Sequence, residues 1–159
     1  MQSKEVFTSS APKELRIDES TKGDYEGLLN GTGKYIHSPF TNLTYYNVFL
    51  VAMSLGAIRG KRRPLNKKLN FIKSQLFKNN YGEALIQALA VFEIGSPSII
   101  IDKNEMYSIA EEYANGGLEI LVEQIVTGSD SIAQEFEEKW KIYISDTLKL
   151  IQGFKEPDH

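Results

Sequence analysis

The residues best suited to do chemistry in this sequence are a run of arginines and lysines near its middle. Nine bases and no acid fall between residues 27 and 82. Arginine pairs with a phosphate group through two parallel hydrogen bonds, and lysine attracts phosphate as a compact point charge. We therefore predict that this segment binds nucleic acid or another anion. The predicted binding residues are Arg59, Lys61, Arg62, Arg63, Lys67 and Lys68.

The same cations have a second use open to them, which is to neutralise acids elsewhere in the fold. Residues 83–159 carry fifteen acids against five bases, and the net charge of the whole chain is −3. Arginine and lysine near the end of a helix also interact favourably with the helix dipole. The sequence leaves both uses open, because it does not show where these side chains point.

No other group of residues points to a reaction or to a bound metal. The chain has no cysteine, and neither His37 nor His159 has a partner at the spacing of a metal site or a catalytic triad. The run Gly31-Thr32-Gly33-Lys34 lacks the full phosphate-loop pattern and follows no predicted strand. We therefore expect no metal and no cofactor.

Composition predicts one helical domain to hold these residues. Hydrophobic residues make up 42% of the 159 residues and charged residues 25%, as in ordinary globular proteins. The sequence has no apolar run long enough to span a bilayer and no signal-peptide core, so we expect no membrane and a cytoplasmic location. We predict a mainly α fold, a compact bundle of five or six helices around a buried central helix with at most a minor β element. The domain should cover residues 13–154, with loose ends at 1–12 and 155–159.

The buried central helix is expected over residues 40–58, where apolar side chains occupy nearly every face. Thr41 or Asn42 is expected to cap its start, and Gly60 its end. A second buried helix is expected over residues 84–94, which are rich in alanine and leucine.

Three short segments are harder to assign. Leu15 and Ile17 alternate with polar residues as in a short edge strand. Residues 67–78 fit either a helix or an extended chain. The β-branched triplet at 99–101 fits either a buried strand or an apolar linker.

Two further helices are expected in the C-terminal part of the chain. The first begins at Asp102, which with Glu105 three residues later resembles a capping box. Gly116-Gly117 either ends this helix as a left-handed cap or marks a place where another element comes close. The last helix carries a continuous stripe formed by Ile132, Phe136, Trp140, Tyr143, Thr147 and Ile151.

Two blocks of the sequence resemble a known family. The first block, residues 48–65, contains the end of the central helix and the basic run, and the second block is residues 109–118. Together they are similar to small bacterial and archaeal proteins associated with Dnd, the DNA phosphorothioate modification systems, over about residues 40–126. The resemblance implies that the gene lies near genes for DNA modification or restriction. It implies no established catalytic role, and no functional residue is carried over from it.

These observations favour an accessory protein linked to DNA modification or restriction, which binds DNA or an acidic protein through the basic segment. One alternative is a helical protein–protein interaction module, either an adaptor or a homodimer that uses Ile142 and Ile144 as its seam. Another alternative is a carboxylate- or metal-dependent nuclease-like enzyme, whose candidate acids are Glu83, Glu111 and Glu112.

Overall fold

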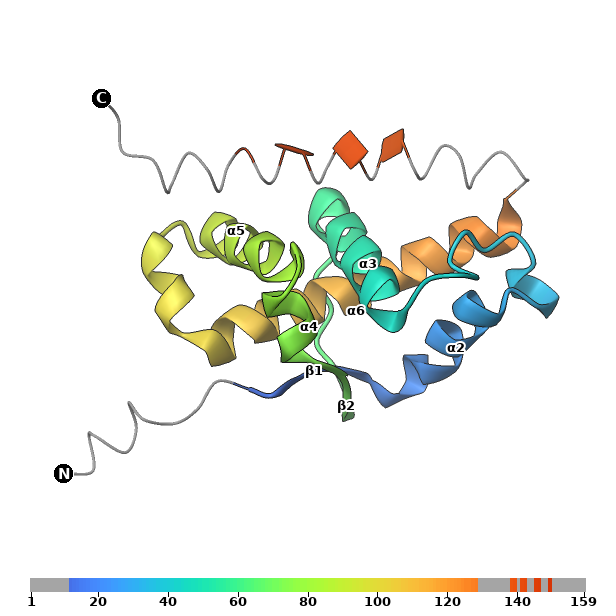
Figure 1. The fold of residues 1–159 in the computed structure, drawn as a ribbon, viewed down its shortest axis with the longest axis horizontal. Coiled ribbons are helices and arrows are strands. Elements are labelled where there is room, and N and C mark those ends of the chain that lie inside the picture. The colour runs from blue at the N-terminus through green and yellow to red at the C-terminus, as the bar shows by residue number, and fades with distance from the viewer. Residues whose placement is uncertain (1–11, 129–137, 140, 143–144, 147–148, 150–159) are drawn as a thin grey trace.

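The fold of the chain, taken from a computed structural model, is shown in Figure 1. The structure describes residues 12–128, 138–139, 141–142, 145–146 and 149. In chain order the elements are β1 (Glu14–Asp18), the 3₁₀ helix η1 (Glu19–Thr21), α2 (Lys22–Asn30), η2 (Gly33–Tyr35), α3 (Tyr45–Arg59), β2 (Lys68–Lys73), α4 (Ser74–Lys78), α5 (Gly82–Ile94), η3 (Pro97–Ile101) and α6 (Lys103–Thr127). Five α-helices and one two-stranded sheet among the described residues confirm the predicted mainly α fold.

The core lies where α3 packs against α6. In Figure 1, α6 runs along the length of the molecule, with α5 and α2 towards opposite ends. Because α3 carries no charged residue before Arg59, it can be enclosed on most sides, and it buries the seven residues Val48, Phe49, Leu50, Val51, Ala52, Met53 and Gly56. Each large apolar side chain buried in this way contributes about 1.5–3 kcal/mol. The predicted buried helix is confirmed, and α6, with thirteen buried residues, shares the centre of the fold with it.

Glycines allow the backbones of α3 and α6 to touch. A Cβ on Gly117 would overlap the carbonyl oxygen of Ala52, and a Cβ on Gly56 would overlap the carbonyl oxygen of Tyr113. The helix α6 continues through both of its central glycines. Of the two predictions for Gly116-Gly117, close approach of another element is confirmed, and the helix cap is wrong.

The strands β1 and β2 pair in antiparallel fashion, with Leu15 opposite Ile72 and a bulge after Leu15. The side chains of Leu15, Ile17 and Ile72 are all buried. The predicted edge strand at Leu15 and Ile17 is confirmed. The ambiguous residues 67–78 divide into a strand, β2, and a short helix, α4.

A buried ion pair joins β1 to α6. The carboxylate of Glu111, a residue only 3% exposed, accepts hydrogen bonds from the backbone N of Arg16 at 2.6 Å and from its Nε and Nη2 at 3.1 and 3.0 Å. Burial raises the pKa of Glu111, and the hydrogen bonds from Arg16 oppose that rise. Removing one partner of a buried pair costs about 3–5 kcal/mol, so this contact keeps the strand against the helix.

The start of α3 differs from its prediction. The helix begins at Tyr45 with Thr44 as the N-cap, and the capping prediction for Thr41 or Asn42 is wrong. The backbone N–H of Thr44 donates to Oδ1 of Asn47 at 3.0 Å as part of a capping box, so the cap lies two or three residues later in the sequence than expected.

The other helix ends agree better with the sequence. Gly60 ends α3 in the left-handed conformation, with φ at 63°. Oδ1 of Asp102 accepts from the backbone N of Glu105 at 3.1 Å, as the capping pattern predicted. Residues 99–101 belong to the 3₁₀ helix η3, which connects α5 to α6, so of the two predictions for this triplet the buried strand is wrong and the apolar linker is confirmed.

The last predicted helix falls largely outside the described residues, as do all six members of its stripe. Of the two seam residues suggested for a homodimer, Ile142 is exposed and Ile144 lies outside the described residues. Among the helices that the structure describes, none combines the length and apolar character needed to cross a bilayer.

Candidate nucleic-acid interface

The predicted binding residues lie at the end of α3, on the segment that follows it, and at the first residue of β2. We call residues 60–67 the basic loop. The basic loop leaves α3 at Gly60 and crosses α6 at very close range, since a Cβ on Gly116 would overlap the carbonyl oxygen of Lys61. The absence of a side chain at Gly116 therefore allows the cationic segment to pass this close to α6.

Hydrogen bonds from α6 hold the backbone of the basic loop. The backbone N of Arg63 donates to the carbonyl oxygen of Glu112 at 3.0 Å. Nδ2 of Asn115 donates to the carbonyl oxygens of Arg63 and Pro64, both at 3.2 Å. These bonds give the loop a defined position without any contribution from its charges.

The far end of the basic loop is held by the end of β1. Oδ2 of Asp18 accepts from the backbone N of Asn66 at 2.7 Å, and its Oδ1 accepts from the backbone N of Ser20 at 3.0 Å. The backbone N of Glu19 donates to the carbonyl oxygen of Lys67 at 2.8 Å. The hydrogen bond from Asn66, followed by those from Ser20, lowers the pKa of Asp18 although burial opposes the change.

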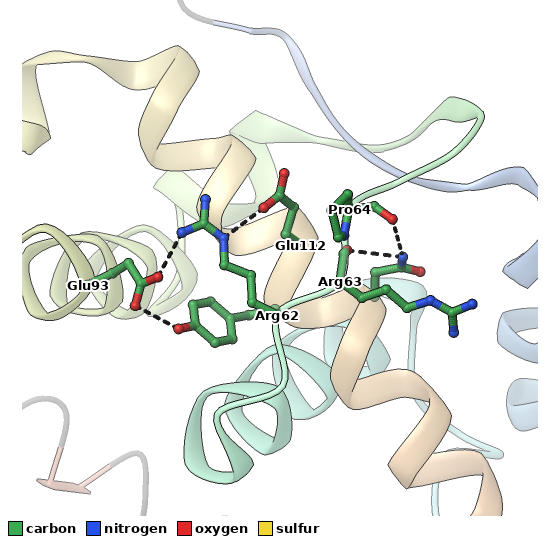
Figure 2. A network of polar contacts seen from close by, with 7 residues as sticks. Arg62, Arg63, Pro64, Glu93 and Glu112 are labelled. Carbon is green, nitrogen blue, oxygen red and sulfur yellow. Dashed lines mark hydrogen bonds and ion pairs between the residues drawn. The ribbon is translucent and has the colours of Figure 1, made fainter.

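Arg62 takes part in a network that joins three elements, as Figure 2 shows. Its Nε donates to Glu112 on α6 and its Nη1 to Glu93 on α5, both at 2.7 Å. The hydroxyl of Tyr113 donates to the other oxygen of Glu93 at 2.7 Å, and the Tyr113 ring lies 5.9 Å from the guanidinium carbon. The hydroxyl and then the guanidinium lower the pKa of Glu93. The charge of Arg62 is thus matched by two carboxylates within the fold.

Arg63 points to the opposite side of the loop in Figure 2 and is far more exposed. Its Nη1 lies 2.8 Å from Oε2 of Glu119, and Nζ of Lys61 lies 3.2 Å from the same oxygen. The side chains of Arg63 and Glu119 are 55% and 53% exposed. Lys67 pairs with Glu19 at 2.8 Å and is also well exposed. These ion pairs are exposed to solvent, and the carboxylate of Glu119 is shared by Lys61 and Arg63.

The last two predicted residues, Arg59 and Lys68, are exposed. Within the part of the chain that the structure describes, neither side chain makes a hydrogen bond or an ion pair. Lys68 lies close enough to Glu111 to oppose, after Arg16, the rise that burial causes in the pKa of Glu111. Anion binding by the six predicted residues stays a prediction, and four of the six pair with glutamates of the same chain.

The candidate acids of the nuclease alternative lie in three different networks. Glu83 accepts from Lys103 at 2.8 Å and from the hydroxyl of Tyr107 at 2.9 Å, whereas Glu111 is bound to Arg16 and Glu112 to Arg62. Among the described residues, no group of three or more acids or histidines is placed to hold a metal ion. The structure does not bring the three glutamates to one site.

The partners of the basic loop were missed from the sequence, although a signal for them exists. Glu112, Asn115 and Glu119 are spaced by three and four residues, which places them on one face of a helix. The loop crosses that face. The spacing would have identified the face, but it could not show that the loop lies against it.

A comparison with protein families places the chain. The model of the family DNA sulphur modification system-associated protein 4 matches residues 24–139. The chain belongs to this family. The predicted resemblance to Dnd-associated proteins is confirmed, and the family name links the chain to a DNA sulphur modification system. No match was found among curated proteins or among solved structures.

The two sequence blocks that carry the resemblance to the DNA sulphur modification system-associated family lie against each other. Block 48–65 supplies most of α3 and most of the basic loop, and block 109–118 supplies a part of α6 that both of them contact. Their glycines and the Arg62 network make this contact. The two blocks therefore share one structural role, which is to hold α3 and the basic loop against α6.

Proposed function

We propose that the chain is an accessory protein of a DNA sulphur modification system that contacts DNA phosphates through the end of α3 and the basic loop. The proposed contact residues are Arg59, Lys61, Arg63, Lys67 and Lys68. The family's link to a system that modifies DNA favours DNA over an acidic protein as the anion.

The observation that supports this proposal is the exposure of the ion pairs made by Lys61 and Arg63. Both cations share one carboxylate, that of Glu119, and all three side chains are between 40% and 55% exposed. An ion pair between exposed side chains contributes only about 0–1 kcal/mol. A DNA phosphate can therefore replace the glutamate at little cost, with release of counterions as an additional gain.

Arg62 is left out of the proposed contact set. Two carboxylates and the Tyr113 ring surround its guanidinium, and its side chain is 31% exposed. Moving it to a phosphate would leave Glu93 and Glu112 without their cation at the junction of α5 and α6. Its role in the proposal is to hold the basic loop in place.

The attraction to DNA must be local, because the chain as a whole carries a charge of −3. At about 0.1 M salt, charges are screened over about 10 Å. Only the exposed cations near the basic loop then act on the phosphates, and binding should depend strongly on salt.

The test is a titration of a short DNA duplex at several salt concentrations. If about four phosphates are contacted, the slope of log K against log salt should be about −3.6. The variant Arg59→Glu/Arg63→Glu should bind much more weakly, with a slope nearer about −1.8. The control Lys22→Glu/Lys78→Glu makes the same charge change at two exposed lysines on α2 and α4 and should behave as wild type.

Absence of measurable binding at low salt would reject the proposal, as would equal affinity for DNA of the Arg59→Glu/Arg63→Glu variant and wild type. Loss of binding in both the variant and the control would point to a diffuse charge effect and would also reject the assigned residues.

The interaction-module alternative draws support from a different part of the surface. Phe92 and Ile101 are 77% and 86% exposed, and Ile94 between them in sequence is also exposed. Large exposed apolar side chains on neighbouring elements are a feature of protein-binding surfaces. If the protein binds no DNA in the titration above, the interaction-module alternative is favoured, with the end of α5 and η3 as the binding surface.

A further inference from the structure

A cavity of about 430 Å³ lies between the first helical turns of the chain, the basic loop and the second half of α6. Its size falls within the range of about 300–1,000 Å³ that is typical of small-molecule sites. Leu118, Val122 and Val126 form an apolar wall along α6. Polar residues line the rest, among them Arg63 of the basic loop and Lys34 of η2.

Three hydroxyl groups line the cavity, and each uses its only proton inside the protein. Ser20 donates to Oδ1 of Asp18 at 2.8 Å, and Thr21 donates to the carbonyl oxygen of Asp18 at 2.7 Å. Thr127 donates to the carbonyl oxygen of Glu123 at 2.7 Å. A hydroxyl whose proton is engaged offers only lone pairs, so these groups present acceptors to the cavity.

Asn115 is 9% exposed and lines the same cavity. Its amide nitrogen donates to two carbonyl oxygens of the basic loop, which fixes the orientation of the side chain because both partners are acceptors. No described residue donates to its Oδ1, and every buried side-chain nitrogen or oxygen among the described residues has a partner. Oδ1 of Asn115 is therefore an accessible acceptor with no donor.

The charges that line the cavity nearly balance. The acids are Asp24, Glu119 and Glu123, and the bases are Lys34 and Arg63, with Lys61 also paired to Glu119. A cavity lined by three acids and two bases, with an apolar wall and mostly acceptors at its surface, suits a ligand that is flat, neutral and rich in hydrogen-bond donors. The bases nearby suit an attached anion.

From this arrangement we infer that the cavity binds a nucleobase with an exocyclic amino group, presented by a nucleotide whose phosphate meets Arg63 or Lys34. The base lies against the wall of Leu118, Val122 and Val126, and its amino group donates to Oδ1 of Asn115. This inference rests on the proposed function for the source of the nucleotide, which is an unpaired residue of DNA. Adenine and cytosine carry the amino group, whereas thymine does not.

The test uses deoxyadenosine, deoxycytidine and thymidine monophosphates, each titrated into the full chain by calorimetry. Deoxyadenosine or deoxycytidine monophosphate should bind at least about tenfold more tightly than thymidine monophosphate, because thymine has no amino group and its one base donor, the ring N3–H, lies between two carbonyl oxygens that would face the acceptors of the cavity. Val126→Phe places a larger side chain in the cavity at its apolar wall and should abolish this binding. Ile101→Phe places the same ring at an exposed apolar position on η3 and is the matched control, with affinity unchanged.

Equal affinity for the three nucleotides would overturn the inference, as would displacement of the nucleotide by inorganic phosphate at a similar concentration. Unchanged binding by Val126→Phe would overturn it as well. The two proposals can fail independently of each other. Duplex binding with the expected salt slope but without a nucleotide preference would reject only the cavity site. A nucleotide preference without duplex binding would support the cavity site and reject only the proposed duplex contact.

Discussion

Two neighbouring arginines, Arg62 and Arg63, have different environments although they are chemically identical. Because the basic loop is extended where it crosses α6, consecutive side chains point to opposite sides, and one side faces the glutamates of α5 and α6. Arg62 is held between two carboxylates, and Arg63 reaches only an exposed one. Side-chain direction therefore decides which arginine lies between two carboxylates of the fold and which has only an exposed carboxylate as its partner.

Asp18 is a second residue whose position in the fold gives it a measurable property. Its hydrogen bonds lower its pKa below the ordinary value of 3.8, so the folded state holds the proton less tightly than the unfolded state. The stability that Asp18 contributes is then fully present above its unfolded pKa and is lost as the pH falls through its lower folded pKa.

We expect Asp18→Asn to destabilise the protein by about 1–3 kcal/mol near neutral pH, because it disturbs the bonds to Asn66 and Ser20. The difference from wild type should shrink as the pH falls through the folded pKa, where the wild-type carboxylate also becomes protonated. Urea unfolding at a series of pH values measures this difference. Glu26→Gln, on the exposed side of α2, is the control and should follow wild type throughout. A constant gap between Asp18→Asn and wild type would contradict the assignment.

At the scale of elements, the helices were predictable because their signals are local. Apolar residues on most faces predicted α3 and α5, and the capping pattern of Asp102 and the glycine at position 60 predicted two helix ends. β2 and η3 were not predictable, because β2 needs its partner β1 from more than fifty residues earlier. The proline-led turn of η3 carries no periodic pattern.

The glycine pair in α6 shows how local reasoning reaches its limit. Glycine inside a helix costs about 1 kcal/mol relative to alanine, so its presence indicates either a break or a close contact. The sequence is compatible with a helix break and with a close contact, and only the position of α3 decides between the two. The same holds for the basic loop, whose partners lie about fifty residues later in α6.

We expect Gly117→Ala to destabilise the protein by about 1–3 kcal/mol or more, because the added methyl group would overlap the backbone of α3 at Ala52. Gly23→Ala is the matched control, since a Cβ at this position in α2 meets nothing within 4 Å. The control should be neutral or gain up to about 1 kcal/mol. Thermal unfolding of the two variants measures the difference. Equal stabilities would mean that α3 and α6 do not approach as closely as described.

At the scale of the whole molecule, the charges form a pattern that segment counts conceal. The basic segment and the acidic half look like separate surfaces in the sequence, yet residues 12–128 hold thirteen acids and thirteen bases. Folding brings many of them together, as the pairs of Arg16, Arg62 and Lys103 show. Composition was enough to single out the six cations as candidates, but which of them pair with glutamates follows from the fold alone.

The extent of the folding unit can be tested at its N-terminal end. The family match begins at residue 24, yet β1 precedes it and supplies Leu15 and Ile17 to the core and Arg16 to the buried pair with Glu111. Burial of the two apolar side chains is worth about 1.5–3 kcal/mol each, and loss of Arg16 leaves a carboxylate buried without its cation.

A chain lacking residues 1–18 should therefore unfold at a much lower temperature than wild type, or fail to fold. A chain lacking only residues 1–11 keeps every contact made by β1 and should unfold as wild type does. Circular dichroism during heating compares the two truncations. Equal unfolding temperatures would show that β1 lies outside the cooperative unit. The family match would then describe the start of the domain better than residue 13, where the sequence places it.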